Sequence, residues 1–490
     1  MMLPYFIIIP LLAAFFITLI AGKKDVWGIS LSLIATVVLL ILSLVSFARL
    51  RGETILYEMG NWKLPIGIAL VLDSLSGFML IIVNLVALTA IIYSIQYIRH
   101  LGQDFKYYGL FMFMLTGMNG VILTGDIFNL YVFMEIALFA AFALVAYGCR
   151  AEEYEAAFKY AIMGAVSSTL ILIAIGVLYS ATSTLTMARI AQAIPSLPSG
   201  IVLWVGGLFL AGFGLKAAAM PFHAWLPDAH SSAPAPISAM LSGVLIKVLG
   251  IYAITRIFFN VLDAPAVFLT IFIVIGTISV LIGGFLAIIQ WDYKRLLAYS
   301  SISQIGYILL GIGLATPLGI LGAIFHLFNH AIFKSLLFYD AGSVELAMGT
   351  RDLRKLGKVG KFLPITSGTS IIASLAISGI PPFNGFFSKL IIIIAAVAAG
   401  QPLLALFAIL GSILTLAAVM KIQRYGLRQD VNVAPVEKVG LGMNVAMICL
   451  AVICLIGGLL VAPGIRNVTL DPVVNVILEK AEYVQMVLGR

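Results

Sequence analysis

The sequence predicts an all-α membrane protein that crosses the bilayer about fourteen times. Of its 490 residues, 62% are hydrophobic and only 10% are charged, and the mean hydropathy is +1.13. Ordinary soluble domains are about 25% charged, so this composition excludes a soluble globular protein. The apolar residues also collect into runs of about 17 to 25, the length of a helix that spans a bilayer.

Polar residues or Gly and Pro turns separate these runs, so each run is expected to form one helix. The first run has neither the basic start nor the cleavage pattern of a signal peptide, and we expect it to be retained as the first span. The expected limits are 3–21, 27–48, 69–97, 107–124, 127–148, 157–180, 201–224, 236–259, 266–289, 296–314, 318–341, 363–398 (interrupted), 402–423 and 442–462.

The charges outside the apolar runs indicate how the chain is oriented. Seventeen of the 29 Lys and Arg residues fall in or beside the loops after odd-numbered helices, and five fall after even-numbered helices. Positive charge gathers on the cytoplasmic side of membrane proteins. The odd loops are therefore predicted to be cytoplasmic, with both termini outside a plasma membrane. The net charge of +8 is then a signal of topology, and no nucleic-acid partner is expected.

Four lysines and one glutamate lie inside the apolar helices. They are Glu135, Lys216, Lys247, Lys334 and Lys389. A charge at the middle of a bilayer costs ~2.5–3.5 kcal/mol on insertion scales, so the set costs on the order of 10 kcal/mol or more unless it faces protein or water. A long side chain near a helix end can instead reach the interface, an alternative that is strongest for Lys334. Together the five residues favour a buried polar pathway.

Prolines interrupt two of the predicted helices next to a lysine. Pro221 follows Lys216 in AAAMPFHAWLPDAH, and Pro381 and Pro382 precede Lys389 in SGIPPFNGFFSKL. A proline inside a helix removes an amide donor and clashes with the preceding turn. Breaks within a membrane are tolerated where protein or water satisfies the freed groups, and paired breaks are typical of inverted repeats in transporters. A packing kink without function is the alternative for each break.

The two breaks lie 161 residues apart, from Pro221-Phe222 to Pro382-Phe383. At this offset the eighth predicted helix corresponds to the thirteenth, which is consistent with two five-helix units formed by helices 4–8 and 9–13. The expected organisation is residues 1–106 for helices 1–3, 107–260 for the first repeat, 261–430 for the second repeat, and 431–490 for helix 14 and a C-terminal tail.

Glu135 lies about nine residues after the polar start of its helix, in TGDIFNLYVFMEIALF, and is not expected at the surface. An isolated carboxylate in an apolar environment takes up a proton, whereas a lysine partner would keep both groups charged. Spacing in the sequence does not say which helices touch, so the partner stays open at this point. A static structural ion pair is the alternative to a pair that handles protons.

The segment HLFNHAIFKSLLFYDAGSV places two histidines and a lysine on one helix face. His326, His330 and Lys334 follow an i, i+4, i+8 spacing, which keeps them within about 80° and spreads them over about 12 Å along the axis. Histidine titrates near neutral pH and can pass a proton in either direction. A lone histidine on an apolar helix is usually a satisfied core residue, but two that end at a lysine favour a proton relay.

The sequence shows no pattern for a resident metal, cofactor or nucleotide. Its three cysteines form no CxxC pair, and His326 and His330 have no Cys, Asp or Glu near them in sequence as a third zinc ligand. No GxGxxG or P-loop follows a plausible strand. Any redox or ATP chemistry is therefore expected in partner subunits.

Five blocks of the sequence resemble a known family. They are DIFNLYVFMEI, GLKAAAMPFHAWLPDAHSSAPAPISAMLSGVLIKVLGIYAITR, WDYKRLLAYSSISQIGYI, HLFNHAIFKSLLFYDAGSV and SGIPPFNGFFSKL. They resemble the antiporter-like subunits shared by Mrp-type cation/proton antiporters, membrane-bound hydrogenase-type complexes and respiratory complex I, over about residues 60 to 430. The resemblance implies fourteen helices in two inverted five-helix repeats, with the seventh and twelfth helices broken.

The resemblance also implies roles for the residues of the first repeat. Glu135 resembles the carboxylate of the fifth helix, and Lys216 resembles its partner in the seventh. Lys247 resembles the relay lysine of the eighth helix.

In the second repeat, His326, His330 and Lys334 match the polar run of the eleventh helix, and Lys389 resembles the terminal group of the twelfth. Some complex I subunits have a glutamate at that last position. The form HLFNHAIFK looks most like the D subunit of Mrp antiporters and its counterpart in hydrogenase-type complexes.

The leading hypothesis is a subunit that moves protons along these buried Glu, Lys and His residues, within an Mrp-type antiporter or a related redox-driven pump. Other membrane subunits would drive it, and membrane lipids would surround it. A complex I-type NADH/quinone oxidoreductase subunit, a stand-alone solute carrier and a structural anchor for a redox enzyme are the alternatives. Sodium as a further cargo, the electron donor and the direction of transport are left open by the sequence.

Overall fold

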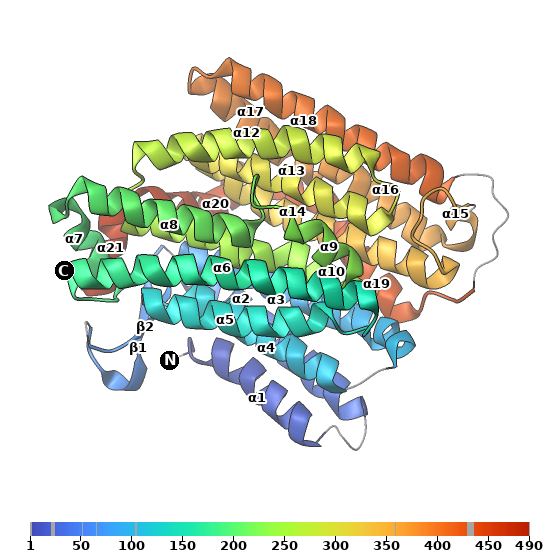
Figure 1. Ribbon diagram of the computed structural model, residues 1–490, viewed down its shortest axis with the longest axis horizontal. Helices are drawn as coiled ribbons and strands as arrows, with labels where there is room; N and C mark the ends of the chain where they lie inside the picture. The colour runs from blue at the N-terminus through green and yellow to red at the C-terminus, as the bar shows by residue number, and fades with distance from the viewer. Residues whose placement is uncertain are drawn as a thin grey trace.

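The chain folds into a bundle of long helices that lie side by side along the longest dimension of the molecule (Figure 1). The computed structural model describes residues 2–20, 25–50, 52–64, 66–102, 105–357, 359–428 and 436–489. The basic residues outside this part, which contributed to the charge pattern, are Lys23, Lys24, Arg51, Lys358 and Arg490. The first helices are α1 (Tyr5–Ile20), α2 (Asp25–Leu50), α3 (Ser74–Tyr97), α4 (Phe105–Leu123), α5 (Ile127–Val145) and α6 (Ala151–Thr182).

The remaining helices complete the bundle and add short connecting elements. They are α7 (Met187–Ala193), α8 (Ser199–Ala217), α9 (Trp225–Ser232), α10 (Ala235–Met240), α11 (Ala253–Thr255), α12 (Ala266–Ile289), α13 (Tyr293–Gly313), α14 (Pro317–Met348), α15 (Val359–Phe362), α16 (Pro364–Ser378), α17 (Asn384–Ala398), α18 (Pro402–Lys421), α19 (Leu441–Ile456), α20 (Pro463–Leu478) and α21 (Lys480–Leu488). In the described part of the chain, eleven helices are long and apolar enough to cross a membrane, and α1, α16 and α17 are apolar but shorter. The predicted all-α membrane fold is confirmed.

Aspartates begin several of the spans. Asp73 caps α3 by accepting a hydrogen bond from Ser76 N at 2.8 Å, and Asp126 and Asp292 accept in the same way at the starts of α5 and α13. These bonds satisfy amides that the first turn of a helix leaves unpaired. The caps explain why these helices begin where the apolar runs begin.

A small antiparallel hairpin replaces the predicted start of the third helix. β1 (Ile55–Glu58) pairs with β2 (Ala69–Leu72), and α3 begins only at Ser74. The apolar run ALVL looks like the first turn of a span when only hydropathy is considered. The C-terminal tail, for which the sequence predicted no element, forms α20 and α21.

The eighth predicted helix is not a regular α-helix. After α10 the chain forms π-helical segments at Leu241–Leu245, Lys247–Tyr252 and Arg256–Val261, with α11 between the last two. Such segments often occur at functional sites. They also change which residues share a face, so the direction of Lys247 could not be predicted from an α-helical spacing.

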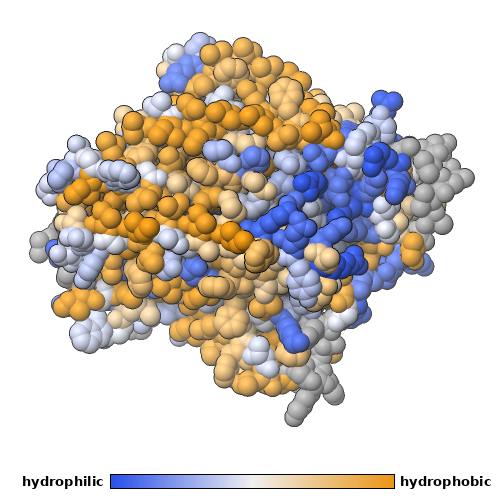
Figure 2. Space-filling view, in the orientation of Figure 1, coloured by the Kyte–Doolittle hydropathy of each residue, from blue (hydrophilic) through white to orange (hydrophobic). Residues whose placement is uncertain are grey.

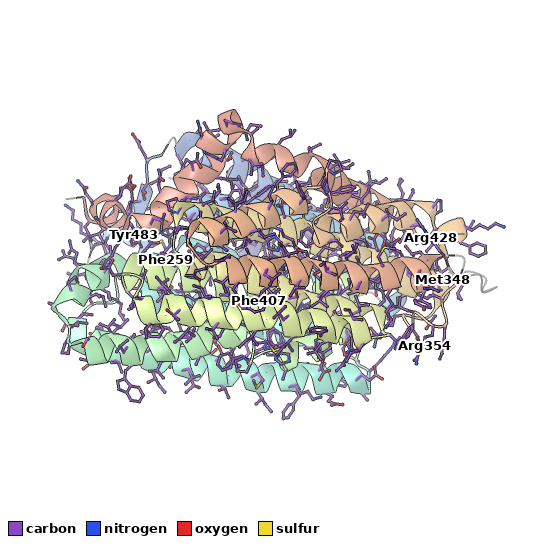
Figure 3. All side chains as sticks on the ribbon, turned by 90° about the horizontal axis from the view of Figure 1, so that it is seen from above. Phe259, Met348, Arg354, Phe407, Arg428 and Tyr483 are labelled. Carbon is purple, nitrogen blue, oxygen red and sulfur yellow. The ribbon has the colours of Figure 1, made fainter. Side chains whose placement is uncertain are left out.

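The bundle has one strongly polar end. Hydrophilic residues gather over the end that includes α9 and α15, whereas the sides are mostly apolar (Figure 2). Met348, Arg354 and Arg428 lie at this end, and Phe259 and Tyr483 lie at the opposite one (Figure 3). We call the polar end the odd-loop end, because the loops after the odd-numbered predicted helices lie there. Both termini lie at the other end, near β1, β2 and α7 (Figure 1).

Candidate functional site

The carboxylate of Glu135 on α5 and the ammonium of Lys216 on α8 face each other. Their closest atoms, Glu135 Oε1 and Lys216 Nζ, are 3.9 Å apart. Ser168 of α6 joins them, because its hydroxyl donates a hydrogen bond to Glu135 Oε1 and accepts one from Lys216 Nζ at 3.0 Å. The partner that spacing alone left open is therefore Lys216, through a serine that the sequence did not indicate.

Glu135 is less enclosed than expected. Its side chain is 22% exposed, whereas that of Lys216 is 2% exposed. α5 also turns Phe128 and Phe139 outward, so the carboxylate lies on a helix that forms part of the lateral face of the bundle. Glu135 is therefore partly buried and not fully enclosed, because sequence position gives depth along a helix but not the direction of the side chain.

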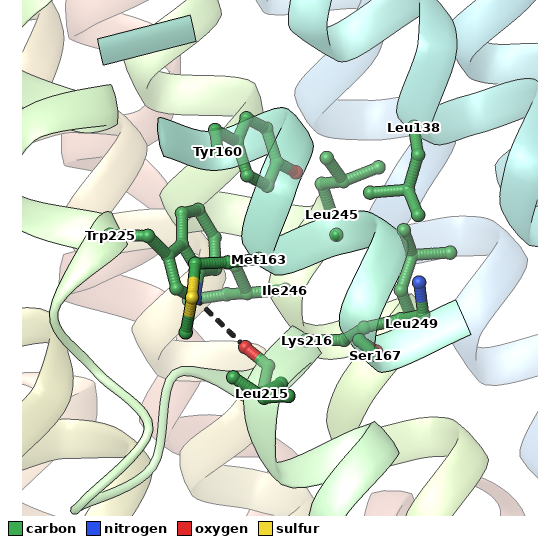
Figure 4. A pocket seen from close by; sticks show the side chains of 11 residues that line it. Leu138, Tyr160, Met163, Ser167, Leu215, Lys216, Trp225, Leu245, Ile246 and Leu249 are labelled. Carbon is green, nitrogen blue, oxygen red and sulfur yellow. Dashed lines mark hydrogen bonds between the residues drawn. The ribbon is translucent and has the colours of Figure 1, made fainter. Parts of the chain in front are cut away.

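A narrow pocket of about 10 Å³ adjoins Lys216 (Figure 4). Its walls are mostly apolar and come from α5, α6, α8, α9 and the π-helical segments. Trp225 stacks on Tyr160 with 4.3 Å between the ring centroids, and its indole donates a hydrogen bond to the carbonyl of Leu215 at 2.9 Å. An apolar wall strengthens the electrostatic interaction between Lys216 and its partners.

The break between α8 and α9 places Lys216 on the last turn of α8. The helix ends at Ala217, Ala218 takes a positive φ of 52°, and Pro221 lies in the connecting segment as predicted. Gly250 of the π-helical segment lets α8 approach closely, because a Cβ at Gly250 would lie 2.6 Å from the Cα of Ala217. A cation on the last turn is also favoured by the unpaired carbonyls of the helix end.

Lys247 lies inside the bundle and has no exposed surface. Its ammonium donates to the carbonyl of Ser242 at 2.5 Å, and Ser242 Oγ lies 2.8 Å from Ser301 Oγ of α13. A backbone carbonyl thus supplies part of the solvation that water would give a cation, and two neighbouring hydroxyls extend the polar group toward α13.

His326, His330 and Lys334, which we call the histidine face of α14, are completely buried. The two imidazole rings are nearly parallel with centroids 6.3 Å apart, and His326 Nδ1 lies 3.0 Å from Ser388 Oγ of α17. Neither ring nitrogen of His330 has a hydrogen-bond partner among the described residues. Direct proton transfer needs heavy atoms about 2.6–3.2 Å apart, so the two rings do not exchange a proton directly in this conformation.

Lys334 does not reach the membrane interface. Its ammonium donates to Leu297 O and to Ser300 Oγ of α13, both at 2.5 Å, and it lies 5.9 Å from the centre of the Phe338 ring. The alternative that this side chain extends to the interface is therefore wrong. The other lysines of the set are buried as well, namely Lys216, Lys247 and Lys389.

Lys389 of α17 has no hydrogen-bond acceptor within the described chain. Its ammonium lies 4.6 Å from the centre of the Tyr307 ring, and that ring lies 5.5 Å from the ring of His326. Tyr307 therefore stands between the histidine face and Lys389, which the sequence did not indicate. The predicted break precedes Lys389, since α16 ends at Ser378 and α17 begins at Asn384.

The seven predicted residues form separate groups. Glu135 and Lys216 are joined, and His326 and Lys389 share Tyr307 as a neighbour. Lys247 has its own oxygen acceptor, the carbonyl of Ser242, and lies within electrostatic range of the histidine face. Within the described residues, no unbroken chain of hydrogen bonds joins all seven.

Two further buried cations were missed, because the charge pattern assigned them to helix ends. Arg256 forms an ion pair with Asp73 at 2.7 Å, and Lys294 forms one with Glu345 at 2.7 Å. The side chains of both cations are at most 4% exposed. Acids far away in sequence pair with them, so no local pattern indicated that these cations are buried.

The side chains that most often hold metals are dispersed. In the ranges that the structure describes, no three His, Cys, Asp or Glu residues lie close enough to hold a metal ion. Of the three free cysteines, Cys149 and Cys449 are exposed and Cys454 is buried.

The sequence of the bundle matches a known family model. Residues 124–415 match the transmembrane family described as NADH:quinone oxidoreductase/Mrp antiporter. This chain belongs to that family of antiporter-like subunits. Residues 58–108 also match the N-terminus of chain 5 of NADH-ubiquinone oxidoreductase (complex I).

Individual proteins resemble this antiporter-like subunit over most of their length. The D subunit of the Na(+)/H(+) antiporter of Alkalihalophilus pseudofirmus is 34% identical over 423 residues, which cover 86% of this chain and 85% of the relative. The N subunit of NADH-quinone oxidoreductase of Desulforudis audaxviator is 36% identical over 417 residues, or 84% and 83% of the two chains. A chain in the structure of the Mrp complex from Dietzia sp. is 27% identical, with a TM-score of 0.93 over 100% of this chain and 99% of that one.

Proposed function

We propose that this antiporter-like subunit moves protons across the membrane along Glu135, Lys216, Lys247, the histidine face and Lys389. The observation that carries the proposal is the contact of Lys216 with Ser168 and Glu135 beside a broken helix. A buried ammonium whose neighbouring carboxylate is held through one hydroxyl can lose that neighbour by a small movement, and its proton affinity then changes.

The size of this effect is sufficient for coupling. Moving the carboxylate from ~4 to ~8 Å from the ammonium weakens their attraction by about 2 kcal/mol at an effective dielectric constant near 20. This is about a 30-fold change in proton affinity. Separation of Glu135 from Lys216 therefore promotes release of the proton, which Lys247 accepts through intervening water. The histidine face and Lys389 carry it further.

The relatives support a place in a multisubunit complex of a bacterial-type plasma membrane. The similarity to the D subunit of the Na(+)/H(+) antiporter and to a chain of the Mrp complex favours an Mrp-type cation/proton antiporter, with other membrane subunits as partners. The similarity to the N subunit of NADH-quinone oxidoreductase favours a second candidate, a subunit of a redox-driven proton pump. Protons are the proposed cargo in both.

The orientation and the internal repeats belong to this proposal. The basic odd-loop end is cytoplasmic, and both termini are outside. Residues 107–260 and 261–430 form two inverted repeats. This assignment is supported by the breaks after α8 and α16, each with a buried lysine beside it.

Transport by the assembled complex in membrane vesicles tests the proposed pathway. We expect Lys216→Ala and Glu135→Gln to abolish coupled proton movement while the subunits still copurify. Lys159→Ala is the matched control, because Lys159 is an exposed lysine of α6 that pairs with Glu155 and Asp228, and it should transport normally. Undiminished transport by Lys216→Ala would contradict the proposal.

The neighbouring subunits decide between the two candidate complexes. Purification in mild detergent should yield small antiporter subunits if the chain serves an Mrp-type antiporter. A quinone-reactive or hydrogenase module in the same preparation would instead favour the redox-driven pump. Measuring proton movement with and without sodium then shows whether sodium is exchanged.

A further inference from the structure

Asp340 is a buried carboxyl group that the proposed pathway does not use. It lies on α14, has no exposed surface, and forms no ion pair with any described Lys or Arg. Its only hydrogen-bond partner in the described chain is Thr369 of α16, whose Oγ1 lies 2.7 Å from Asp340 Oδ1, and its Oδ2 has none. An unpaired carboxylate is costly in such a place, so the group holds a proton at rest.

The hydroxyl of Thr369 suits both protonation states of Asp340. It also lies 3.0 Å from the carbonyl of Ile365 and 3.1 Å from that of Thr366. It donates to Asp340 when the carboxyl is ionised. When the carboxyl is protonated, the hydroxyl accepts its proton in a hydrogen bond and donates to one of the two carbonyls. Gain or loss of the proton therefore leaves the hydroxyl satisfied.

The other titratable groups around Asp340 do not compete with it near neutral pH. Tyr93 of α3, Tyr293 of α13 and Cys454 of α19 are within electrostatic range. Phenols and buried thiols are neutral under these conditions. Asp340 is thus the group in this cluster that can exchange a proton.

Hydroxyl groups continue from Asp340 along one face of α16. This hydroxyl face consists of Thr366, Ser370, Ser374 and Ser378, each at most 3% exposed. Their i, i+4 spacing places each about one turn beyond the last, over about 18 Å. Gln423 bridges the two central serines, since its Nε2 donates to Ser370 Oγ at 3.2 Å and to Ser374 Oγ at 2.9 Å.

The hydroxyl face has a surface pocket at one end and Lys389 at the other. Thr366 lines a pocket of about 320 Å³ at the odd-loop end, together with Glu437. At the other end Ser378 directly precedes Gly379, where the stem of Lys389 packs so closely that a Cβ on Gly379 would lie 3.0 Å from Lys389 Cδ. The hydroxyl face therefore runs from a surface pocket to the side chain of Lys389, whose ammonium has no hydrogen-bond acceptor among the described residues.

We propose that Asp340 and the hydroxyl face form a second proton branch, which loads Lys389 from the odd-loop end. The inference rests on the proposed function, because Lys389 belongs to the main pathway. The Asp340 acid releases one proton, which passes along the hydroxyls and intervening water to the neutral amine of Lys389 and forms its ammonium. One aqueous proton then enters at the pocket and converts the Asp340 carboxylate back to the acid. No other reactant is needed.

Infrared difference spectroscopy of the purified complex tests the protonation step without a transport cycle. The carboxyl C=O band that Asp340→Asn removes is assigned to Asp340. We expect this band to shift soon after transfer from H₂O to D₂O, because the branch connects the acid to water. Exchange as slow as that of the core amides, or the absence of such a band, would overturn the proposal.

Transport measurements test the branch itself. Asp340→Asn keeps the shape and the acceptor for Thr369, and Thr369→Val keeps the shape of the hydroxyl residue. Both should lower the transport rate by about tenfold or more, as removal of a positioned acid–base group does. Thr116→Val is the matched control, because Thr116 is a buried hydroxyl on α4 that donates only to Met112 O.

The two proposals fail in different ways. Full transport by Asp340→Asn, in vesicles where Lys216→Ala has none, would overturn the branch and leave the main pathway in place. Full transport by Lys216→Ala would overturn the proposed function, and the exchange of the Asp340 band would still decide whether this acid communicates with water. Copurification of the partner subunits confirms in each case that the variant has assembled.

Discussion

At the scale of single residues, the link between Glu135 and Lys216 depends on a serine. Their closest nitrogen and oxygen atoms are 3.9 Å apart, which is longer than a direct hydrogen bond. Ser168 lies between them and makes the two bonds that hold the charges together. Rotation of this hydroxyl would break both hydrogen bonds, and separating the two charges further requires the carboxylate itself to move.

We expect Ser168→Ala to lower coupled proton transport several-fold, because both charges lose a hydrogen-bond partner while their separation stays near 4 Å. The loss should be smaller than that of Lys216→Ala. Thr169→Val serves as the control, since Thr169 is the next residue on α6 but is exposed. Transport rates measured side by side in vesicles decide the matter, and a wild-type rate for Ser168→Ala would contradict a bridging role.

The buried lysines could be predicted from the sequence, because a charged side chain inside a membrane-spanning helix is stable only where it faces protein or water. The hydroxyls around them could not. A serine or threonine in a helix can donate to a carbonyl of its own preceding turn, so it carries no penalty that marks it in the sequence. In the sequence, Ser168 and Ser300 cannot be distinguished from the many serines whose hydroxyls only donate to a backbone carbonyl of their own helix.

At the scale of elements, the end of α8 is fixed by its contact with the π-helical segment that carries Lys247. The backbone at Ala217 lies where the Cβ of residue 250 would be, so only glycine fits at that position. Lys216 and Lys247 are thereby held on two elements that touch without intervening side chains. Their relative position depends on this contact.

We expect Gly250→Ala to destabilise the protein by about 1–3 kcal/mol, the usual cost of overpacking a well-filled core. Gly207→Ala is the control. It lies on α8 with no atom within 4 Å of the added Cβ, so it should be neutral or stabilising by up to about 1 kcal/mol. The thiol of buried Cys454 reports unfolding in detergent, in a Cys149→Ser, Cys449→Ser background. Equal stability of the two variants would contradict the close packing.

The ion pair of Arg256 with Asp73 joins the start of α3 to the end of the eighth predicted helix. We expect Asp73→Asn to cost about 3–5 kcal/mol, because it leaves a buried guanidinium without a counter-charge. Asparagine still caps α3, so the effect reports the charge and not the cap. Combining it with Arg256→Met should restore much of the lost thermal stability. An unchanged melting temperature for Asp73→Asn alone would show that the pair contributes nothing.

The breaks were predictable at the level of elements, because proline removes a donor wherever it stands in a helix. The hairpin and the π-helical segments were not. The run ALVL of β2 is as apolar as a span, and only its pairing with Ile55–Glu58 makes it a strand. The π-helical segments depend on contacts such as that of Gly250 with Ala217, which join residues far apart in the sequence.

At the scale of the whole molecule, charge and hydropathy divide the surface into a polar odd-loop end and apolar sides (Figure 2). The odd-loop end combines several ion pairs, such as those of Arg351 with Asp292 and of Arg295 with Asp228. Sorting the basic residues by loop predicted this end, because the charges of a membrane protein must gather where there is water.

Cys149 reports which side of the membrane this end faces. It is exposed and follows α5 at the odd-loop end. We expect a membrane-impermeant maleimide to label it in inside-out vesicles and not in right-side-out vesicles. Ser196→Cys in a Cys149→Ser background gives the opposite control, because Ser196 is exposed beyond α7 at the other end. The reverse labelling pattern would overturn the proposed orientation.

The distance of 6.3 Å between the rings of His326 and His330 has a consequence for the membrane as an insulator. A membrane protein that let protons pass freely would dissipate the transmembrane potential. That potential is worth about 2.3 kcal/mol per elementary charge for each 100 mV. The two imidazoles are too far apart for direct proton transfer, so the proposed pathway is interrupted between them in this conformation. If the pathway operates as proposed, a movement or a water molecule must bridge this gap before a proton can pass.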